Sequence, residues 1–245
     1  MTDAAGARVG GAGASTGGPS QTIAFEAVAV VREGRSALDD VSVRLGERRI
    51  GFVGLNGSGK STLLKAIIGL VRPTAGRITV DGRDVASEVR AVRATTGLLF
   101  QNPDNQIVYP IVGEDLAFGL KNHGFSKAET AARVAAALER LGIGGFATRR
   151  IHELSGGEKQ LVALAGLLAI EPKTVLFDEP TSQLDLKNRN RFRDVLAALP
   201  EQALVVAHDL ELLSDFDRVI VMEAGRIAFD GAPDAALAAY RESVR

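Results

Sequence analysis

The segment that most restricts how this 245-residue chain can fold is a glycine-rich loop between an apolar run and a helical pattern. The loop, Gly54–Ser61, reads GLNGSGKS and has the spacing of a phosphate-binding loop. It follows the apolar run Arg49–Val53, which predicts a strand, and it opens Lys60–Leu70, which has helical spacing. A plain glycine-rich turn is the alternative. The combination of strand, loop, lysine–serine pair and helix favours the phosphate site instead.

Six residues of this loop, and Thr62 just after it, are candidates for nucleotide binding. Lys60 would contact the phosphates through its ammonium group, and the Ser61 hydroxyl would hold Mg²⁺. Glycines let backbone N–H groups turn toward the phosphates, and the N-terminus of the helix adds positive potential there. The predicted ATP-binding residues of this segment are Asn56, Gly57, Ser58, Gly59, Lys60, Ser61 and Thr62.

Two carboxylates follow a second apolar run and suit the same nucleotide. Val175–Phe177 is a short run of the kind buried in a parallel sheet, and Asp178 and Glu179 come directly after it. Asp178 would complete the Mg²⁺ shell, directly or through water. Glu179 would orient or deprotonate the attacking water. An acidic pair after a strand is often only a solvated turn, but the phosphate-binding loop favours the functional interpretation.

Composition and pattern together predict one α/β domain. Hydrophobic residues make up 46% of the chain and charged residues 24%, as in ordinary globular proteins, and there are no cysteines. The formal net charge of −1 gives no reason to expect a nucleic-acid partner. A β-rich start precedes a helical insert at about 103–170, and β/α alternation follows it. We expect a flexible tail at 1–21 and a single domain at 22–241, with no apolar run long enough to span a bilayer.

The coarse element pattern fits this organisation. Ser126 is a predicted N-cap for the helix Lys127–Leu141, with Glu129 in its first turn. A turn containing Gly46 would join two of the strands. The further expected strands are Thr22–Val31, Val41–Leu45, Arg77–Asp81, Gly97–Phe100, Leu204–Ala207 and Arg218–Met222.

Leu154–Gln160 reads LSGGEKQ and resembles the signature motif of the ABC family. The resemblance covers Thr22–Tyr240, and its elements come in the family's order. They are the phosphate loop, Gln101, the signature, Asp178-Glu179, Ser182–Asp185 and His208. It implies a P-loop NTPase fold of the ABC nucleotide-binding type, with an N-terminal antiparallel β subdomain and a helical subdomain. Taken alone, Ser155 and two glycines before an apolar helix present backbone donors to a phosphate, or merely cap that helix.

The resemblance also implies roles for individual residues and a partner for the chain. ATP hydrolysis with Mg²⁺ is expected, with Gln101 completing the metal and water shell and His208 holding Glu179 and the water against the γ-phosphate. Each ATP would lie between two nucleotide domains, formed by a second copy of the chain or by a paralogue. The residues expected to bind ATP across that interface are Ser155, Gly156, Gly157, Glu158 and Asp185.

One position departs from the family pattern. ABC proteins usually stack the adenine on an aromatic side chain near the end of the first strand, and this chain has no aromatic residue at 30–34. Arg32 could stack on the base through its planar guanidinium group. A solvated edge residue is an equal alternative.

The segment after Gln101 indicates which subfamily of ABC proteins the chain resembles. Gln101–Gln106 and Val112–Gly119 resemble the coupling region of energy-coupling-factor (ECF) importer ATPases, in which a helix lines a groove for a transmembrane partner. Glu114 and Asp115 could pair with basic residues of that partner, or simply be favoured by the helix dipole. The resemblance implies a transmembrane coupling subunit, a substrate-binding membrane subunit, and a place at the cytoplasmic face of the cell membrane.

Within this group the chain most resembles the ATPases of biotin transporters. The supporting segments are Ile151–Leu154, Asp185–Arg189 and the short end Leu237–Tyr240, after which many metal-importing relatives continue. The expected function is therefore the ATP-hydrolysing motor of an importer for biotin. The alternatives are the same motor in a cobalt or nickel importer, and an ABC ATPase acting on DNA or ribosomes. The last is disfavoured because the chain has neither coiled-coil arms nor a second nucleotide domain.

Overall fold

The strands of this protein form two sheets, and one of them carries the phosphate loop. The structure is a computed structural model, and it describes residues 21–32 and 34–245. The first sheet is antiparallel, in the order β2 (Arg35–Leu45), β1 (Ile23–Arg32), β4 (Ala75–Val80), β5 (Arg83–Asp84). The second has the order β10 (Arg226–Gly231), β9 (Arg218–Glu223), β3 (Arg49–Val53), β8 (Gln202–Val206), β7 (Thr174–Asp178), β6 (Thr96–Leu99).

The second sheet is parallel from β9 to β6, and only β10 runs antiparallel to its neighbour. Every residue of β3, β7 and β8 is buried, as expected for parallel strands covered on both faces. Because β3, β7 and β8 are neighbours and run the same way, the segments that follow them meet at one edge of the sheet. Those segments contain the phosphate loop, the acidic pair and His208.

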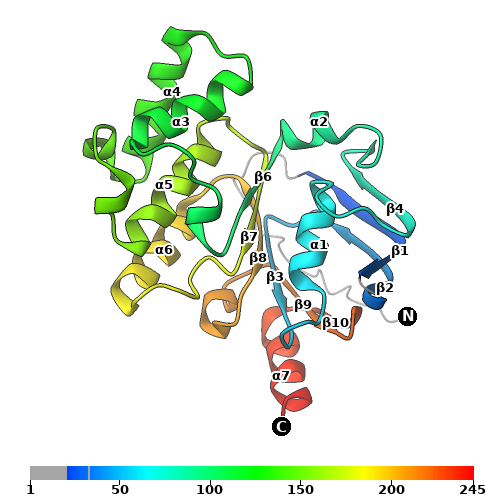
Figure 1. The fold of residues 1–245 in the computed structure, drawn as a ribbon. Coiled ribbons are helices and arrows are strands. Elements are labelled where there is room, and N and C mark those ends of the chain that lie inside the picture. Colours follow the sequence, from blue (N-terminus) through cyan, green and yellow to red (C-terminus); the bar gives the residue numbers. More distant parts are fainter. Residues whose placement is uncertain (1–20, 33) are drawn as a thin grey trace, which may run out of the picture.

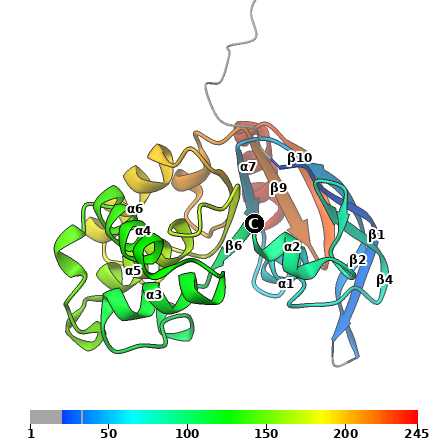
Figure 2. The same cartoon turned by 90° about the horizontal axis from the view of Figure 1, so that it is seen from above.

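Helices cover both faces of this sheet (Figures 1 and 2). The α-helices are α1 (Lys60–Ile67), α2 (Val89–Arg93), α3 (Val112–Asn122), α4 (Lys127–Arg140), α5 (Gly156–Leu168), α6 (Leu186–Ala198) and α7 (Pro233–Ser243). The 3₁₀ turns are η1 (Pro103–Asn105), η2 (Gly144–Phe146), η3 (Ile151–Glu153) and η4 (Leu210–Leu213). No helix in the described ranges has both the length and the apolar character needed to cross a bilayer.

The two faces of the parallel sheet belong to two separate hydrophobic clusters. Along β8, Ala203 and Val205 pack with the helices α3 to α6, while Leu204 and Val206 pack with α1 and the antiparallel sheet. This alternation follows from the two-residue period of a strand. Figure 2 shows the same division, with the antiparallel sheet and α1 on one side and the group α3–α6 on the other.

β2 and β3 are joined at Gly46 as predicted, and they lie in different sheets, because β2 pairs with β1 and β3 pairs with β8 and β9. Two sequence expectations need correction. Gln21 is not part of a tail: it is 2% exposed, and its amide donates to the Asp81 carboxylate (3.1 Å) and the Thr95 hydroxyl (3.0 Å). The first α-helix ends at Ile67, before Gly69. Residues 1–20 of the expected tail lie outside the described residues.

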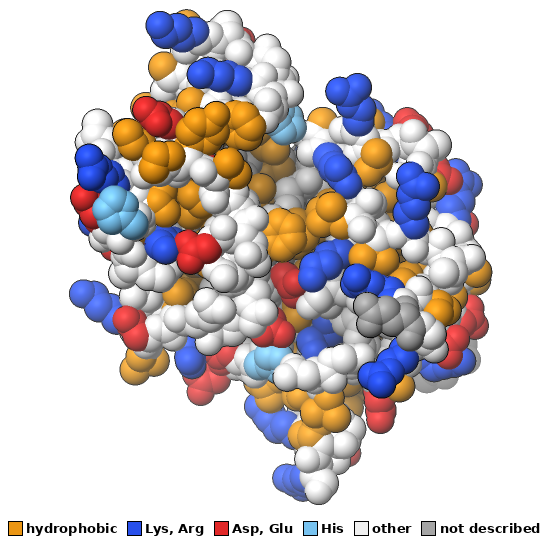
Figure 3. Space-filling model, viewed as in Figure 1, with side chains coloured by type: hydrophobic (Ala, Val, Ile, Leu, Met, Phe, Trp, Pro, Cys, Tyr) orange, Lys and Arg blue, Asp and Glu red, His pale blue; other side chains and the backbone are white. Residues whose placement is uncertain are grey.

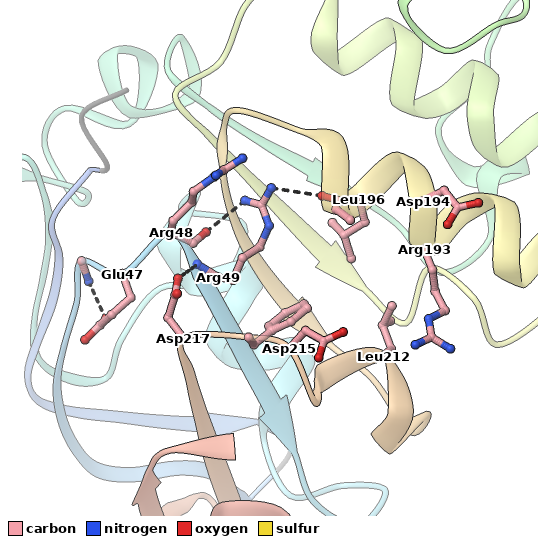
Figure 4. Close-up of a pocket in the computed structure, with 12 residues that line it drawn as sticks. Glu47, Arg48, Arg49, Arg193, Asp194, Leu196, Leu212, Asp215 and Asp217 are labelled. Carbon is pink, nitrogen blue, oxygen red and sulfur yellow. Dashed lines mark hydrogen bonds between the residues drawn. The ribbon is translucent and has the colours of Figure 1, made fainter. Parts of the chain in front are cut away.

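A buried arginine joins the beginning of β3 to the end of α6, at the end of the sheet away from the phosphate loop. Arg49 begins β3 and donates through its guanidinium to the carbonyl oxygens of Leu196, Leu199 and Glu201, at and just after the end of α6. Burial, and secondarily the charge of Arg48, lowers the pKa of Arg49 to about 10. A cavity of about 700 Å³ opens beside it, and none of the predicted site residues lines this cavity (Figure 4).

Candidate functional site

The phosphate loop has the backbone shape that its glycines predict. Gly59 has φ of +104°, and a Cβ there would lie 2.5 Å from the carbonyl oxygen of Ala37. A Cβ on Gly54 would lie 2.2 Å from the carbonyl oxygen of Met222. Any side chain at these two positions would force the loop away from the antiparallel sheet and β9, so glycine is required by close approach as well as by conformation.

The N-terminus of α1 is left open by the same glycine. Gly59 is the N-cap residue, and no side chain caps the helix. The N–H groups of Lys60, Ser61 and Thr62 fall in the first turn, where no intrahelical acceptor exists. Free N–H groups together with the positive end of the helix dipole form a site for a phosphate anion.

Lys60 lies across the loop and is almost completely buried, at 4% exposure. Its Nζ donates to the carbonyl oxygens of Gly54 (2.8 Å) and Leu55 (2.9 Å) and lies 3.5 Å from the Ser58 hydroxyl. Burial lowers the pKa of Lys60 from its ordinary value, and the charges of Glu179 and Asp178 oppose that shift. The ammonium group is thus held inside the loop that is expected to receive the phosphates.

Ser61 and Asp178 meet across the base of the site. The Ser61 hydroxyl donates to Asp178 Oδ1 at 2.6 Å, and Lys65 Nζ lies 3.5 Å from Asp178 Oδ2. The residue Asp178 is 5% exposed, at the end of β7. A hydroxyl and a carboxylate oxygen in contact, next to an expected phosphate, are the oxygen ligands that Mg²⁺ prefers. The side chains predicted to hold Mg²⁺ therefore fit that ion, and no cluster of three or more His, Cys, Asp or Glu offers another metal site in the described ranges.

Glu179 contacts two of the predicted residues and also Ser182, to which the sequence assigned no role. Its Oε1 lies 3.0 Å from His208 Nε2, and its Oε2 accepts from Gln101 Nε2 at 3.0 Å. The same Gln101 amide is 3.2 Å from the Ser182 hydroxyl, which donates to the carbonyl oxygen of Glu179. Side chains that follow β6, β7 and β8 thus converge on one carboxylate, as the parallel order of these strands requires.

The backbone of Glu179 is held in an uncommon conformation. Its φ is +51°, in the left-handed region that non-glycine residues seldom adopt. The neighbouring strand holds it there, because the Glu179 N–H donates to the carbonyl oxygen of Val206 at 3.0 Å. Such conformations cost about 1–3 kcal/mol and gather at functional sites. Here the turn directs the carboxylate toward His208 and Gln101.

The signature segment begins α5 with a reciprocal cap. Ser155 Oγ accepts from the Glu158 N–H at 3.3 Å, and Glu158 Oε2 accepts from the Ser155 N–H at 2.8 Å. Arg149, which the sequence analysis missed, donates to Glu158 Oε1 at 2.9 Å. The backbone hydrogen bond from Ser155 chiefly, and Arg149 in addition, lower the pKa of Glu158. Both Glu158 oxygens are occupied locally, while Ser155 and Gly156 are exposed.

The signature helix packs against neighbouring segments of the same chain. A Cβ on Gly157 would lie 2.5 Å from Cγ of Asn188, a residue that Asp185 holds through the N-cap of α6. Lys159 forms an ion pair with Asp104 of η1 at 2.7 Å. Among residues 21–32 and 34–245, no hydrogen bond or ion pair joins the signature segment to the phosphate loop, so the two parts of the predicted ATP site remain separate in this chain.

Three further predicted residues lie outside this cluster. Arg32 is exposed at the end of β1, in register with Arg35. On α3, Glu114 is exposed, whereas Asp115 has a local role: its Oδ1 accepts from the N–H groups of Val108 (2.7 Å) and Tyr109 (2.9 Å). Asp115 thus fixes the loop in front of α3, a contact between neighbouring segments that sequence spacing did not reveal.

Comparison with known proteins gives the class. Residues 38–182 match the family described as ABC transporter. The chain belongs to this family and is one of its ATPases. The α/β fold, with its antiparallel sheet and its helices, is that of the family, as the sequence predicted.

Within this family, the chain is similar to ATP-binding proteins of biotin and cobalt transport. The chain is 50% identical over 220 residues to the biotin transport ATP-binding protein BioM of Rhizobium etli, covering 90% of this chain and 98% of that protein. It is 43% identical over 209 residues to the cobalt import ATP-binding protein CbiO of Syntrophus aciditrophicus, covering 83% and 75%. Its structure is similar to that of cbiO1 from Clostridium perfringens, part of the ABC transporter complex cbiONQ, with a TM-score of 0.79, 31% identity, and 91% and 92% of the two chains covered.

Proposed function

We propose that this protein is the ATP-hydrolysing motor of an energy-coupling-factor importer for biotin, acting at the cytoplasmic face of the cell membrane. The observation that carries the proposal is the position of Glu179, whose carboxylate contacts His208 and Gln101 directly beside the Asp178–Ser61 pair. Such an arrangement places a base, its positioning groups and the predicted metal ligands around one point. It is suited to attack of water on a γ-phosphate.

Each residue of the cluster has a role in that reaction. The open N-terminus of α1 and Lys60 hold the phosphates of ATP. Glu179 accepts a proton from the attacking water, and His208 and Gln101 hold the carboxylate in place. Ser182 restrains both Gln101 and the Glu179 backbone, so the base stays aligned between turnovers. Hydrolysis is thus divided between residues that bind the phosphates and residues that direct water.

Ser61, Asp178 and Gln101 would hold Mg²⁺ together with the phosphates. When bound, this ion neutralises the charge that develops on the phosphate oxygens. Ser61 and Asp178 are already in contact through a 2.6 Å hydrogen bond. Gln101 instead contacts Glu179, so it would reach the metal only after the side chain turns.

A second nucleotide domain completes the site. Ser155 and Gly156 are exposed at the start of α5, and Asp185 caps the start of α6 nearby. A glycine-containing helix start that is exposed and separate from the phosphate loop of its own chain is explained by a head-to-tail pair of domains about a two-fold axis. We propose that Ser155, Gly156 and Gly157 bind the γ-phosphate held by the partner's loop. Glu158, whose oxygens are both occupied, would support that contact by capping the helix.

The membrane partner is expected on the α3 side of the molecule. Val108 (71% exposed), Tyr109 (39%) and Phe118 (38%) leave apolar side chains in solvent, and the two aromatic rings lie 5.0 Å apart. In Figure 3 hydrophobic side chains gather on the helical side of the molecule, in the area of α3 and α4. Apolar surface next to the exposed Glu114 suits an amphipathic, basic helix of a transmembrane coupling subunit, and Asp115, although bound to the preceding loop, adds negative charge there.

The similarity to biotin transport proteins supports biotin as the cargo of the assembly, carried by a substrate-binding membrane subunit. The similarity to a cobalt import protein supports a second candidate, the same motor in an importer for cobalt or nickel. Both candidates share the ATPase chemistry and differ only in the membrane partners.

Isolation of the assembly from native membranes in mild detergent tests this proposal. The tagged protein should bring down two membrane proteins, one of which binds radiolabelled biotin. Binding of cobalt or nickel by those partners, without biotin, would replace the cargo and keep the motor. Recovery of ribosomal or DNA-bound material, with no membrane protein, would contradict the importer.

A further inference from the structure

Within residues 21–32 and 34–245, Lys65 is the cation that forms an ion pair with the carboxylate proposed to bind Mg²⁺. It lies on α1 one turn beyond Ser61, and residues four apart share one face of a helix. The two side chains accordingly reach the same group: Ser61 Oγ contacts Asp178 Oδ1 at 2.6 Å, and Lys65 Nζ lies 3.5 Å from Oδ2. Each oxygen of the carboxylate thus has its own partner on α1.

Asp178 is more deeply buried than Lys65 and needs a compensating partner. The carboxylate is 7% exposed, whereas the Lys65 side chain is 32% exposed and opens to solvent. A carboxylate withdrawn from water is costly unless an opposite charge or a hydrogen bond compensates it. Lys60 is also close, but its ammonium group is committed to the carbonyl oxygens of the phosphate loop. Among these groups, Lys65 is the one whose ion pair faces Asp178 itself.

We propose that Lys65 is a positioning residue that acts as a resident counter-cation for Asp178. It holds the carboxylate in place when no metal is bound, and its positive charge weakens the binding of Mg²⁺ at the same carboxylate. The proposal rests on the proposed assignment of Asp178 and Ser61 as metal ligands. It concerns how tightly the metal is held, not whether ATP is hydrolysed.

A lysine in the last turn of a helix is also favoured by the helix dipole, whatever it contacts. The helix-dipole explanation predicts that Lys65 has no effect on metal binding. An experiment can therefore separate it from the role as a counter-cation. Lys173 is a matched control: it precedes β7 at the end opposite Asp178, and it pairs with Asp81 at 3.4 Å. Replacing it removes the same type of side chain and a similar ion pair far from the phosphate loop.

The test measures the metal-dependent gain in nucleotide affinity. Binding of a fluorescent, non-hydrolysable ATP analogue is measured with excess Mg²⁺ and again with EDTA, and the ratio of the two dissociation constants reports the contribution of the metal. In Lys65→Met this ratio should rise about tenfold, because a positive charge next to a divalent ion is removed. Lys65→Arg and Lys173→Met should keep the wild-type ratio. In EDTA all three variants should bind the analogue as the wild type does.

The outcomes separate this inference from the function on which it rests. A ratio in Lys65→Met that stays unchanged or falls would overturn the role of Lys65. If Asp178→Asn leaves the ratio at the wild-type value, the proposed metal site itself is wrong. Lys65→Gln, which keeps a polar head group, provides the same measurement if the methionine variant does not fold.

Discussion

Lys60 and Ser61 are neighbours in the chain, yet their side chains serve different parts of the site. Lys60 turns back over the phosphate loop, and Ser61 reaches Asp178 on the adjacent strand. Both residues were predictable from a single motif. Lys65 and Arg149 were not predicted, and Ser182 was named without a role, because their contacts depend on strand order and helix packing. The i,i+4 spacing of Ser61 and Lys65 was the one signal in the sequence that could have revealed a further partner of Asp178.

At the residue scale, Lys60→Ala should weaken ATP binding by roughly tenfold to a hundredfold. Hydrogen bonds from a charged donor contribute about 1.5–3 kcal/mol, and the ammonium group of Lys60 is buried inside the phosphate loop. Equilibrium binding of a fluorescent ATP analogue measures the change. Lys173→Ala, an exposed lysine outside the loop, is the control and should bind as the wild type does. Equal affinities of both variants would exclude Lys60 from the phosphate site.

At the scale of elements, the buried parallel strands were predictable and the peripheral elements were not. β3, β7 and β8 are short apolar runs that end in functional residues, so their sequence pattern is strong. β10 is mostly exposed, and it lacks the continuous apolar run that marks the central strands. α7 was also missed, although its proline in the first turn is a recognised start signal. The assignment of β2 and β3 to different sheets depends on long-range pairing, which local pattern does not encode.

Two helices offer a comparison of capping with function. α4 and α5 begin with the same reciprocal cap, Ser126–Glu129 and Ser155–Glu158. Ser126→Ala and Ser155→Ala should each lower the free energy of unfolding by about 1 kcal/mol, measured by urea denaturation. Only Ser155→Ala should also lower ATPase activity, because that helix start is proposed to bind the partner's nucleotide. An equal loss of activity in both variants would assign Ser155 a purely structural role.

At the scale of the whole molecule, one chain holds two half-sites that do not meet. The phosphate loop, Asp178, Glu179 and His208 gather at the edge of the parallel sheet, while the signature segment starts a helix in the group α3–α6. The phosphate loop, Asp178 and Glu179 were predictable from their own sequence pattern, whereas the roles of His208 and the signature segment were predicted through family resemblance. The two half-sites would meet only where two nucleotide domains associate. The dimer in which each ATP lies between two domains therefore stays a prediction.

The most direct test of this account is the nucleotide-dependent association of Glu179→Gln, followed by multi-angle light scattering. The substitution removes the proposed base, which should slow hydrolysis by at least about a hundredfold while leaving the phosphate-binding groups in place. With ATP and Mg²⁺ the measured mass of the variant should double from the 25.8 kDa of one chain. The mass should return to that of one chain when the nucleotide is removed. A variant that binds ATP, no longer hydrolyses it and still remains at 25.8 kDa would contradict the shared site.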